Sequence, residues 1–495
     1  MSAIVRPLLR GPRSAIAAAH PLAVAAGSDV LAAGGNALDA AIAAAAALAV
    51  VTPDACGLGG DALLIVRRAG ESPVAFLGAA ALPRRPLAPI TVYGPASAGV
   101  PGAVAAWCAA HARFGRHPLA DVLAPSVELA AGGFPASAGL IGALSRRRER
   151  LQAGARGWSV LGATTGSTLR QPELANTLRT ICSKGAAGFY SGPVAAATVA
   201  SVRGAAGDGI SAEDLAGYSV IGEPPLTGAY GRARISVVPA PSQAALALLA
   251  LEALEPAPAP GSPDGEHAAI EAIKQAFERR EALTSGTDLE ALRRTPLPLP
   301  GARASALNRP TAADHTAAVT SADADGTVVS MLVSVFHEFG SGVLVPDTGF
   351  LLNNRLSSLA GSGSLLADLR PGERPPHTLS PMLLKLDRRC LALATPGADG
   401  QVQTLVQLVR RLVDTDTDLS EALHLPRWRA VAGRLAIEMS FDPEVRRTLV
   451  ARGHAVDVHD DGHPLFGAVA AAGTDGATGV VCASDPRREV WAAVR

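Results

Sequence analysis

The chain has 495 residues, of which 48% are hydrophobic and 18% charged, enough apolar material for at least one large core. Its 44 basic residues balance its 44 acidic residues, so the composition predicts no basic surface for nucleic acid and no membrane-coating role. Glycine and proline together make up about 18% of the chain, below the fraction that signals low-complexity disorder.

The five cysteines are widely spaced, and the closest two stand 52 residues apart, so the sequence has no CxxC pair for zinc or thiol redox chemistry. Such a sparse, odd set is typical of buried thiols in a reducing compartment. Arg6, Arg10 and Arg13 interrupt the N-terminal apolar stretch, which argues against a secretory signal. The longest apolar run, 40–51, is too short to span a bilayer. We therefore expect a soluble, cytoplasmic protein.

The first third of the chain is predicted to be rich in helices. Asn36 is a favourable N-cap, with Asp39 in the first turn, for an alanine-rich helix that ends before Pro53. Alanine on nearly every face predicts that this helix is buried. A glycine-rich turn at 57–61 leads into a strand at 62–66. Further helices are predicted as short pieces within 104–133 and at 174–181, 211–215 and 267–283.

The composition changes at the proline-rich segment 284–313, which is predicted to be an exposed connection. Two β-prone runs then flank Asp323-Ala324-Asp325-Gly326 and predict a hairpin. A three-residue loop with Gly326 in the left-handed conformation pairs residue numbers that sum to 650, which places Ser334 across from Thr316. Later strands are expected at 342–345, 382–386, 390–395 and 479–483, with a helix at 401–412.

Motifs of several common enzyme classes are absent from the sequence. There is no GxSxG motif, which argues against an ordinary α/β-hydrolase serine. None of the three lysines follows a glycine, so there is no P-loop. Six histidines and aspartates crowd into 454–463, but their spacing matches no metal-ligand pattern. A solvated turn ahead of a strand is the preferred interpretation, and a metal site is the alternative.

A long series of segments, in colinear order over nearly the whole chain, resembles the γ-glutamyltransferase family. The resemblance begins with 17–61, which ends in ACGLGGD. Further matches are VPG at 100–102, GFP at 133–135, QPELA at 171–175, GFYSG at 188–192, DADG at 323–326, FGSG at 339–342, GFLLNN at 349–354, TPG at 395–397 and SDPR at 484–487. No single segment is specific to the family, but together and in this order the segments are strong evidence for the resemblance.

Members of that family are N-terminal-nucleophile hydrolases with an α+β fold, a four-layer αββα sandwich. Their precursor cuts itself, and the new N-terminal threonine of the small subunit is the nucleophile. Counted back from Asp323, that threonine falls on Thr316. The resemblance therefore implies cleavage between His315 and Thr316, giving segments 1–315 and 316–495 of one intertwined fold. It implies no metal and no organic cofactor.

The chemistry of self-cleavage independently requires a hydroxyl or thiol at such a position. The side chain must attack its own preceding carbonyl group and hold the acyl group as an ester. Once the ester is hydrolysed, the residue has a free hydroxyl and a free α-amine with a pKa of roughly 7.7–8.0, which can take the hydroxyl proton. Nucleophile and base thus share one residue. An ordinary strand threonine is the alternative interpretation of Thr316.

The resemblance assigns catalytic roles to three further residues. Gly397 and Ala398 are expected to supply the backbone N–H groups of an oxyanion hole, although relatives often have a second glycine where Ala398 stands. A plain strand-to-helix turn is the alternative. Ser334 matches a hydroxyl that supports the nucleophile in relatives. Its alternative is a hairpin serine on the other face.

The sequence departs from typical members at the groups that hold a glutamyl substrate. The segment 78–83, where relatives carry an arginine, has none, and no carboxylate follows Asn353-Asn354. His377-Thr378 replace a double serine, and Ala317-Ala318 follow the threonine where relatives often have Thr-His. A zwitterionic glutamyl head would lose both of its charged partners, which is enough to change the substrate.

The segments around Thr316, Arg355, His377 and Gln401 look more like a divergent branch that includes oxamate amidohydrolase-like proteins. In that interpretation Arg355 is a bidentate grip for a substrate carboxylate, and His377 and Thr378 assist recognition. A surface arginine and a structural histidine are the alternatives.

We expect an amide hydrolase or acyltransferase that acts through an acyl-enzyme on a small amide-containing substrate. Its large and small subunits would come from one precursor. The alternative is an uncleaved, non-catalytic homologue that serves as a binding or structural protein.

Overall fold

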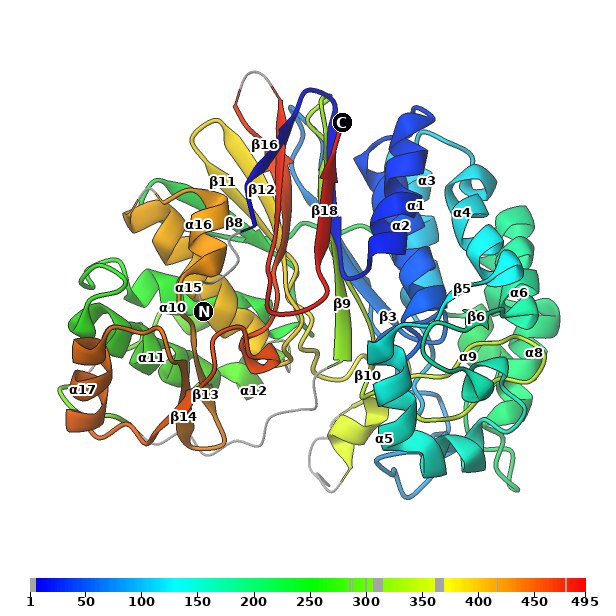
Figure 1. Cartoon of the computed structure of the whole chain (residues 1–495). Coiled ribbons are helices and arrows are strands. Elements are labelled where there is room, and N and C mark those ends of the chain that lie inside the picture. The colour runs from blue at the N-terminus through cyan, green and yellow to red at the C-terminus, as the bar shows by residue number, and fades with distance from the viewer. Residues whose placement is uncertain are drawn as a thin grey trace.

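The computed structural model describes residues 6–284, 286, 288–298, 301–305, 315–360, 369–415, 417–476 and 479–495. Within these ranges two β-sheets pack face to face, and helices cover both outer faces, which makes four layers (Figure 1). The predicted αββα sandwich is confirmed. In the described part of the chain, no helix is both long enough and apolar enough to cross a membrane.

The first sheet is antiparallel and has six strands. Their order is β18 (Trp491–Val494), β2 (Ser14–Ala18), β9 (His315–Asp323), β10 (Val328–Phe336), β3 (Asp61–Arg67) and β4 (Val74–Gly78). Alternate residues of β3 face opposite layers: Leu64 packs toward the helices, whereas Leu63 and Ile65 pack between the sheets. All nine residues of β10 are buried, which explains its nearly continuous apolar sequence.

The second sheet is also antiparallel and has seven strands. Their order is β1 (Leu9–Gly11), β17 (Val480–Ser484), β16 (Ala470–Thr474), β12 (Arg389–Ala394), β11 (Met382–Leu386), β8 (Ala233–Val237) and β7 (Leu226–Tyr230). Both sheets therefore combine strands from before and after the His315–Thr316 bond. Segments 1–315 and 316–495 share one set of hydrogen-bonded sheets and the core between them.

Helices of the first 216 residues cover the six-stranded sheet (Figure 1). All 15 residues of α2 (Ala37–Val51) are buried, and the predicted cap is present: Asn36 and Asp39 form a capping box. Alanine allows the close approach that this buried position needs. The neighbouring helices are α1 (Pro21–Ala32), α3 (Ala103–Phe114), α4 (Leu119–Gly132), α5 (Ala138–Gly154), α6 (Pro172–Lys184), α7 (Ala187–Tyr190), α8 (Gly192–Ser201) and α9 (Ala212–Ala216).

The opposite layer covers the seven-stranded sheet with α10 (Leu246–Ala253), α11 (Pro263–Glu278) and α15 (Gly400–Asp414). Smaller elements complete the described fold: α12 (Arg280–Thr284), α13 (Leu289–Arg293), α16 (Leu419–His424), α17 (Pro443–Ala451), β5 (Phe134–Pro135), β6 (Thr168–Leu169), β13 (Trp428–Val431), β14 (Arg434–Glu438) and β15 (Val456–His459).

Three predicted segments differ from the structure. The helix predicted at 267–283 is two helices, because the chain tightens where the Arg279 N–H donates to the Ala276 carbonyl group. The strand predicted at 342–345 is wrong: Gly342 has φ +74°, and only a single bridge forms there. The connection predicted at 284–313 contains α13 with Leu289 and Leu292 buried, while 306–313 lie outside the described residues.

Candidate active site

The β9–β10 hairpin has the predicted register over most of its length. Paired residues sum to 650 from Ala322–Val328 to Ala317–Val333, and Gly326 has φ +80°. The register then shifts, so that Phe336, with φ +79°, lies opposite His315. Such a bulge re-aims side chains at the end of a strand.

Despite the bulge, the hydroxyl groups of Thr316 and Ser334 lie together. Thr316 Oγ1 is 3.5 Å from Ser334 Oγ, a long contact. Ser334 Oγ donates to the His315 carbonyl oxygen at 2.8 Å and accepts from the Phe336 N–H at 2.9 Å. The Ser334 hydroxyl thus contacts both the candidate nucleophile and the carbonyl group that this nucleophile would attack.

The glycine loop, 395–398, connects β12 to α15. Gly397 has φ +136° and Ala398 has φ +45°, and both carbonyl oxygens are occupied. Gly397 O accepts from Gly400 N at 2.7 Å, and Ala398 O accepts from Gln401 N at 3.1 Å. The amide N–H groups of Gly397 and Ala398 donate to no group among the described residues. Two unpaired N–H groups at the start of a helix are what an oxyanion hole requires.

A buried charge cluster lies one strand beyond Ser334. Asp61 is the β3 partner of Ser334, and it is completely buried on the face that Leu63 and Ile65 turn toward the second sheet. Its Oδ2 accepts from Arg355 at 2.8 and 3.1 Å and from His377 Nε2 at 3.0 Å. Its Oδ1 accepts from the N–H of residue 80 at 2.7 Å. The structure therefore brings the predicted residues Arg355 and His377 together through Asp61.

The protonation states of this cluster follow from its contacts. Burial acts to raise the pKa of Asp61, but the neighbouring Arg355 and His377 outweigh burial and hold that pKa below its usual range. Burial, aided by the positive charge of Arg355, lowers the pKa of His377 to about 4. The Leu379 N–H donates to His377 Nδ1 at 3.2 Å, so Nε2 carries the proton shared with Asp61. The cluster is an ion pair with a neutral imidazole.

This arrangement changes what Arg355 can offer to a substrate. Two of its donor atoms are used on Asp61, and its guanidinium group lies 4.0 Å over the Phe336 ring. Of the three guanidinium nitrogen atoms of Arg355, only Nη1 has no hydrogen-bond partner in the described part of the structure. The predicted bidentate grip would require Arg355 to leave Asp61, whereas a single contact through Nη1 would not. Thr378 is buried beside Ser380, which donates to its carbonyl oxygen at 3.0 Å.

Sequence reasoning missed three residues that build this site. Asp61 carried the clearest signal, because a carboxylate at the start of an apolar strand needs a buried partner. Gln243 joins the glycine loop to His377, since its side chain donates to Ala398 O at 3.3 Å and its backbone N–H to His377 O at 2.9 Å. Arg280 pairs with Asp399 at 3.0 Å, directly after the loop, and no local pattern indicated it.

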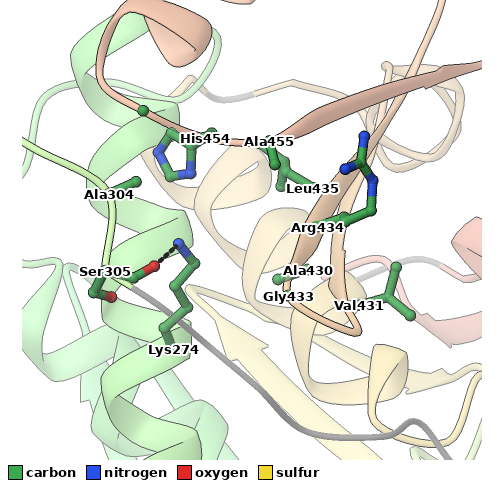
Figure 2. Close-up of a pocket in the computed structure, with 11 residues that line it drawn as sticks. Lys274, Ala304, Ser305, Ala430, Val431, Gly433, Arg434, Leu435, His454 and Ala455 are labelled. Atoms are coloured by element: carbon green, nitrogen blue, oxygen red, sulfur yellow. Dashed lines mark hydrogen bonds between the residues drawn. The ribbon is translucent and has the colours of Figure 1, made fainter.

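A second polar cluster borders a hollow of about 230 Å³ between α11, the β13–β14 turn and the start of β15 (Figure 2). His267, Glu271 and His454 have the chemistry of metal ligands. However, His267 contacts His454 at 2.8 Å and Gly301 O at 2.8 Å, and Glu271 accepts from Lys274 Nζ at 2.8 Å. These contacts account for the cluster, and the Lys274 ammonium would repel a cation. His454 is buried, so it does not belong to the solvated turn predicted for 454–463.

Comparison with known proteins agrees with this architecture. The family model described as gamma-glutamyltranspeptidase matches residues 23–494. The glutathione hydrolase-like YwrD proenzyme of Bacillus subtilis is 30% identical, and the match covers 96% of this chain and 97% of that protein. The oxamate amidohydrolase proenzyme of Klebsiella pneumoniae is 32% identical over 90% of this chain and 91% of its own.

Among solved structures, the cephalosporin acylase from Bacillus halodurans has a TM-score of 0.87 and 28% identity, covering 99% of this chain and 97% of that chain. The two sequence relatives are enzymes that are named as proenzymes, which supports the expectation that this chain is a self-processing enzyme. Their names give no support to the alternative of an uncleaved, non-catalytic homologue. The chain belongs to the gamma-glutamyltranspeptidase family of self-processing N-terminal-nucleophile amide hydrolases and acyltransferases.

Proposed function

We propose that Thr316 is the nucleophile of this enzyme and that self-cleavage at the His315–Thr316 bond activates it. One observation carries the proposal: a single hydroxyl group, on Ser334, contacts both Thr316 Oγ1 and the carbonyl oxygen of His315. An ordinary strand threonine has no reason to donate to a hydroxyl group that itself donates to the carbonyl oxygen of the residue before it.

Self-cleavage begins when Thr316 Oγ1 attacks the His315 carbonyl carbon and the acyl group moves from nitrogen to oxygen. The Ser334 hydroxyl donates to the carbonyl oxygen and stabilises the negative charge that develops there. The hydroxyl proton passes to the nitrogen, so this shift frees the α-amine of Thr316, and water then hydrolyses the ester and frees the hydroxyl group. That amine is the general base of the mature enzyme, because part of it is neutral near pH 7.

In each turnover Thr316 Oγ1 attacks the substrate amide and forms an acyl-enzyme. The free N–H groups of Gly397 and Ala398 are the donors for the developing oxyanion, and each such donor contributes about 3 kcal/mol. The amine product leaves, and water resolves the ester by hydrolysis. An acceptor amine resolves it by transfer.

The substrate we propose is a small amide that carries a carboxylate and is not a γ-glutamyl compound. Arg355 Nη1 is buried without a partner, and the Arg280 guanidinium beside the glycine loop adds positive charge. Segment 78–83, the position of the substrate-binding arginine in typical members, instead gives a backbone N–H to Asp61. The oxamate amidohydrolase relative is named for an amide of this kind.

Purified protein tests the proposal directly on a denaturing gel. The wild-type chain of 50.1 kDa should give two bands, and the intact mass of the smaller one should begin at Thr316. Thr316→Ala should remain a single band without amidase activity, and Thr316→Ser should still split, since it keeps a hydroxyl. Splitting of Thr316→Ala at the same bond would refute the proposal. Oxamate-like amides compared with γ-glutamyl anilides then test the substrate class.

A further inference from the structure

A hollow of about 150 Å³ opens beside the bond that is to be cut. Residues His315 to Ala317 of β9 form one wall, and Pro396 of the glycine loop lies on another. Residues 52, 54 and 55, just after α2, and residues 488–490 close the remaining sides. A water molecule occupies about 30 Å³ of liquid, so this space has room for several of them beside His315 and Thr316.

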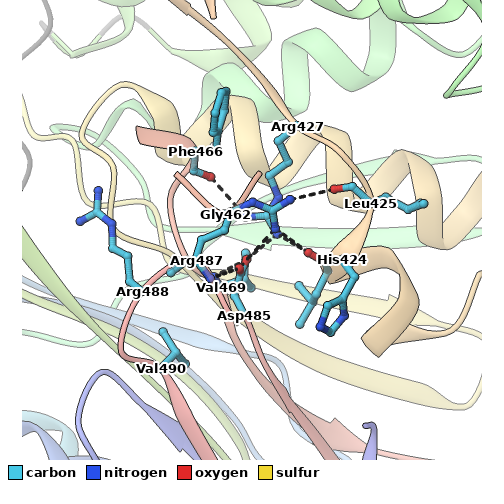
Figure 3. Close-up of polar contacts among 12 residues, drawn as sticks. His424, Leu425, Arg427, Gly462, Phe466, Val469, Asp485, Arg487, Arg488 and Val490 are labelled. Atoms are coloured by element: carbon cyan, nitrogen blue, oxygen red, sulfur yellow. Dashed lines mark hydrogen bonds and ion pairs between the residues drawn. The ribbon is translucent and has the colours of Figure 1, made fainter. Parts of the chain in front are cut away.

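Both remaining walls are held firmly. The Phe339 N–H donates to Asp54 O at 2.9 Å, which ties the end of α2 to the segment after β10. Residues 488–490 follow a buried network in which Asp485 Oδ2 accepts from Arg427 at 2.6 Å (Figure 3). In the same network Arg487 pairs with Glu438 at 2.6 Å. The backbone on these two sides of the hollow is therefore tied to the fold.

Asp54 is the carboxyl group best placed in this hollow to exchange a proton. It is half-buried, and no hydrogen bond or ion pair from another residue of the described chain occupies its carboxylate. Burial raises its pKa to about 6, the carboxylates of Glu338 and Glu489 add to this, and Arg146 opposes it. Arg488 and His315 are the other charged or titratable groups of the hollow. A group that titrates near neutral pH is suited to proton transfer.

We propose that Asp54 is the base that activates the water molecule which completes self-cleavage. This inference rests on the proposed function of Thr316. The Asp54 carboxylate takes a proton from water while the water oxygen bonds to the His315 carbonyl carbon. The ester bond to Thr316 Oγ1 then breaks, and Oγ1 takes the proton back from Asp54. The products are the His315 carboxyl group and a Thr316 residue with a free hydroxyl and a free amine.

The rate of precursor conversion, followed on gels from pH 5 to 8, tests this assignment. In the wild-type chain the rate should rise as Asp54 ionises and level off above about pH 7. Asp54→Asn should convert at least tenfold more slowly at pH 7.5 and lose the pH dependence below that pH. Glu489→Gln is the matched control: it removes an exposed carboxylate from the same hollow, so it should convert at the wild-type rate at pH 7.5 and keep a pH-dependent rate, with the midpoint shifted slightly to lower pH. Asp54→Glu should retain a pH-dependent rate.

Hydroxylamine identifies the step. It cleaves esters without a protein base, so neutral hydroxylamine should split the Asp54→Asn precursor into a small chain of the wild-type mass and a large chain that ends in a hydroxamate of His315. Resistance to hydroxylamine, or a wild-type rate and profile for Asp54→Asn, would overturn the assignment. A wild-type chain that never splits would instead overturn the proposed function of Thr316. Burial already favours the uncharged form of Asp54, so the Asn variant should retain the wild-type unfolding temperature.

Discussion

The hydroxyl pair at the end of the β9–β10 hairpin and the charge cluster around Asp61 lie on neighbouring strands but are held in opposite ways. Thr316 is half-buried and has one long contact of 3.5 Å. Asp61 is fully buried and accepts four hydrogen bonds of 2.7 to 3.1 Å. A group that must move during a reaction is lightly restrained, whereas charges removed from water must be paired with one another.

The largest expected effect comes from breaking the cluster. Asp61→Ala leaves the Arg355 guanidinium buried without a counter-ion, so the free energy of unfolding should fall by about 3–5 kcal/mol. Denaturant unfolding of the Thr316→Ala precursor, a single chain, measures this. Asp457→Ala is the matched control because it breaks an exposed pair with Arg434, and it should change stability little. If Asp61→Ala and Asp457→Ala lowered the free energy of unfolding equally, the buried pair would be no more important for stability than the exposed one, and the contrast would be wrong.

Removing the other hydroxyl of the pair tests the reactive end. Ser334→Ala deletes the donor to the His315 carbonyl oxygen, so self-cleavage should slow by about 10²–10³-fold. A time course on denaturing gels measures this rate. Ser330→Ala removes a hydroxyl of the same strand that donates to Leu393 O, and it should convert at the parent rate. Conversion of Ser334→Ala at that rate would show that its hydroxyl is structural.

Acid should weaken the cluster around Asp61. Burial lowers the pKa of His377 to about 4, while its ordinary value is 6.5, so the unfolded chain binds the proton more tightly. Stability from this residue is complete above pH 6.5 and is lost as pH falls toward 4, by about 3 kcal/mol in all. His377→Gln abolishes this dependence, so its stability deficit relative to the parent should shrink between pH 7 and pH 4.5. If the free energies of unfolding of the parent and His377→Gln changed equally with pH, His377 would not be a neutral imidazole in the folded chain.

The smallest effect is expected from Ala398→Gly in the glycine loop. Ala398 has φ +45°, a left-handed conformation that costs an alanine about 1 kcal/mol, so Ala398→Gly should raise stability by no more than that. The amide N–H remains, and amidase activity should stay within a few-fold of the parent. Gly397→Ala should have the opposite effect on stability. Gly397 has φ +136°, which is strained for any residue with a side chain, so this variant should be less stable and less active than the parent. A stabilising Gly397→Ala would contradict this geometry.

Much of the fold followed from local patterns. The cap at Asn36, the buried helix α2 and the hairpin register depend on residues close in sequence, and the structure has all three. The strand predicted at 342–345 failed because its apolar residues pack without a ladder, in a segment of turns. The bulge at Phe336 also escaped prediction, since nothing in the hairpin sequence marks it.

The site was less accessible to sequence reasoning for a physical reason. Thr316 and Ser334 are 18 residues apart on one hairpin, so turn geometry brings them together. Asp61 and Arg355 are 294 residues apart, and only the assembled sheet makes them partners. Arg355 was therefore interpreted as a free grip, because its counter-ion belongs to a distant strand.

The sharing of both sheets between segments 1–315 and 316–495 has a consequence for the mature enzyme. Once the His315–Thr316 bond is cut, global unfolding also separates two polypeptides, because neither keeps a complete sheet. Melting of the precursor should not depend on protein concentration, whereas melting of the mature enzyme should shift upward as concentration rises. The single hydrolysed bond thus converts an intramolecular folding equilibrium into a bimolecular one.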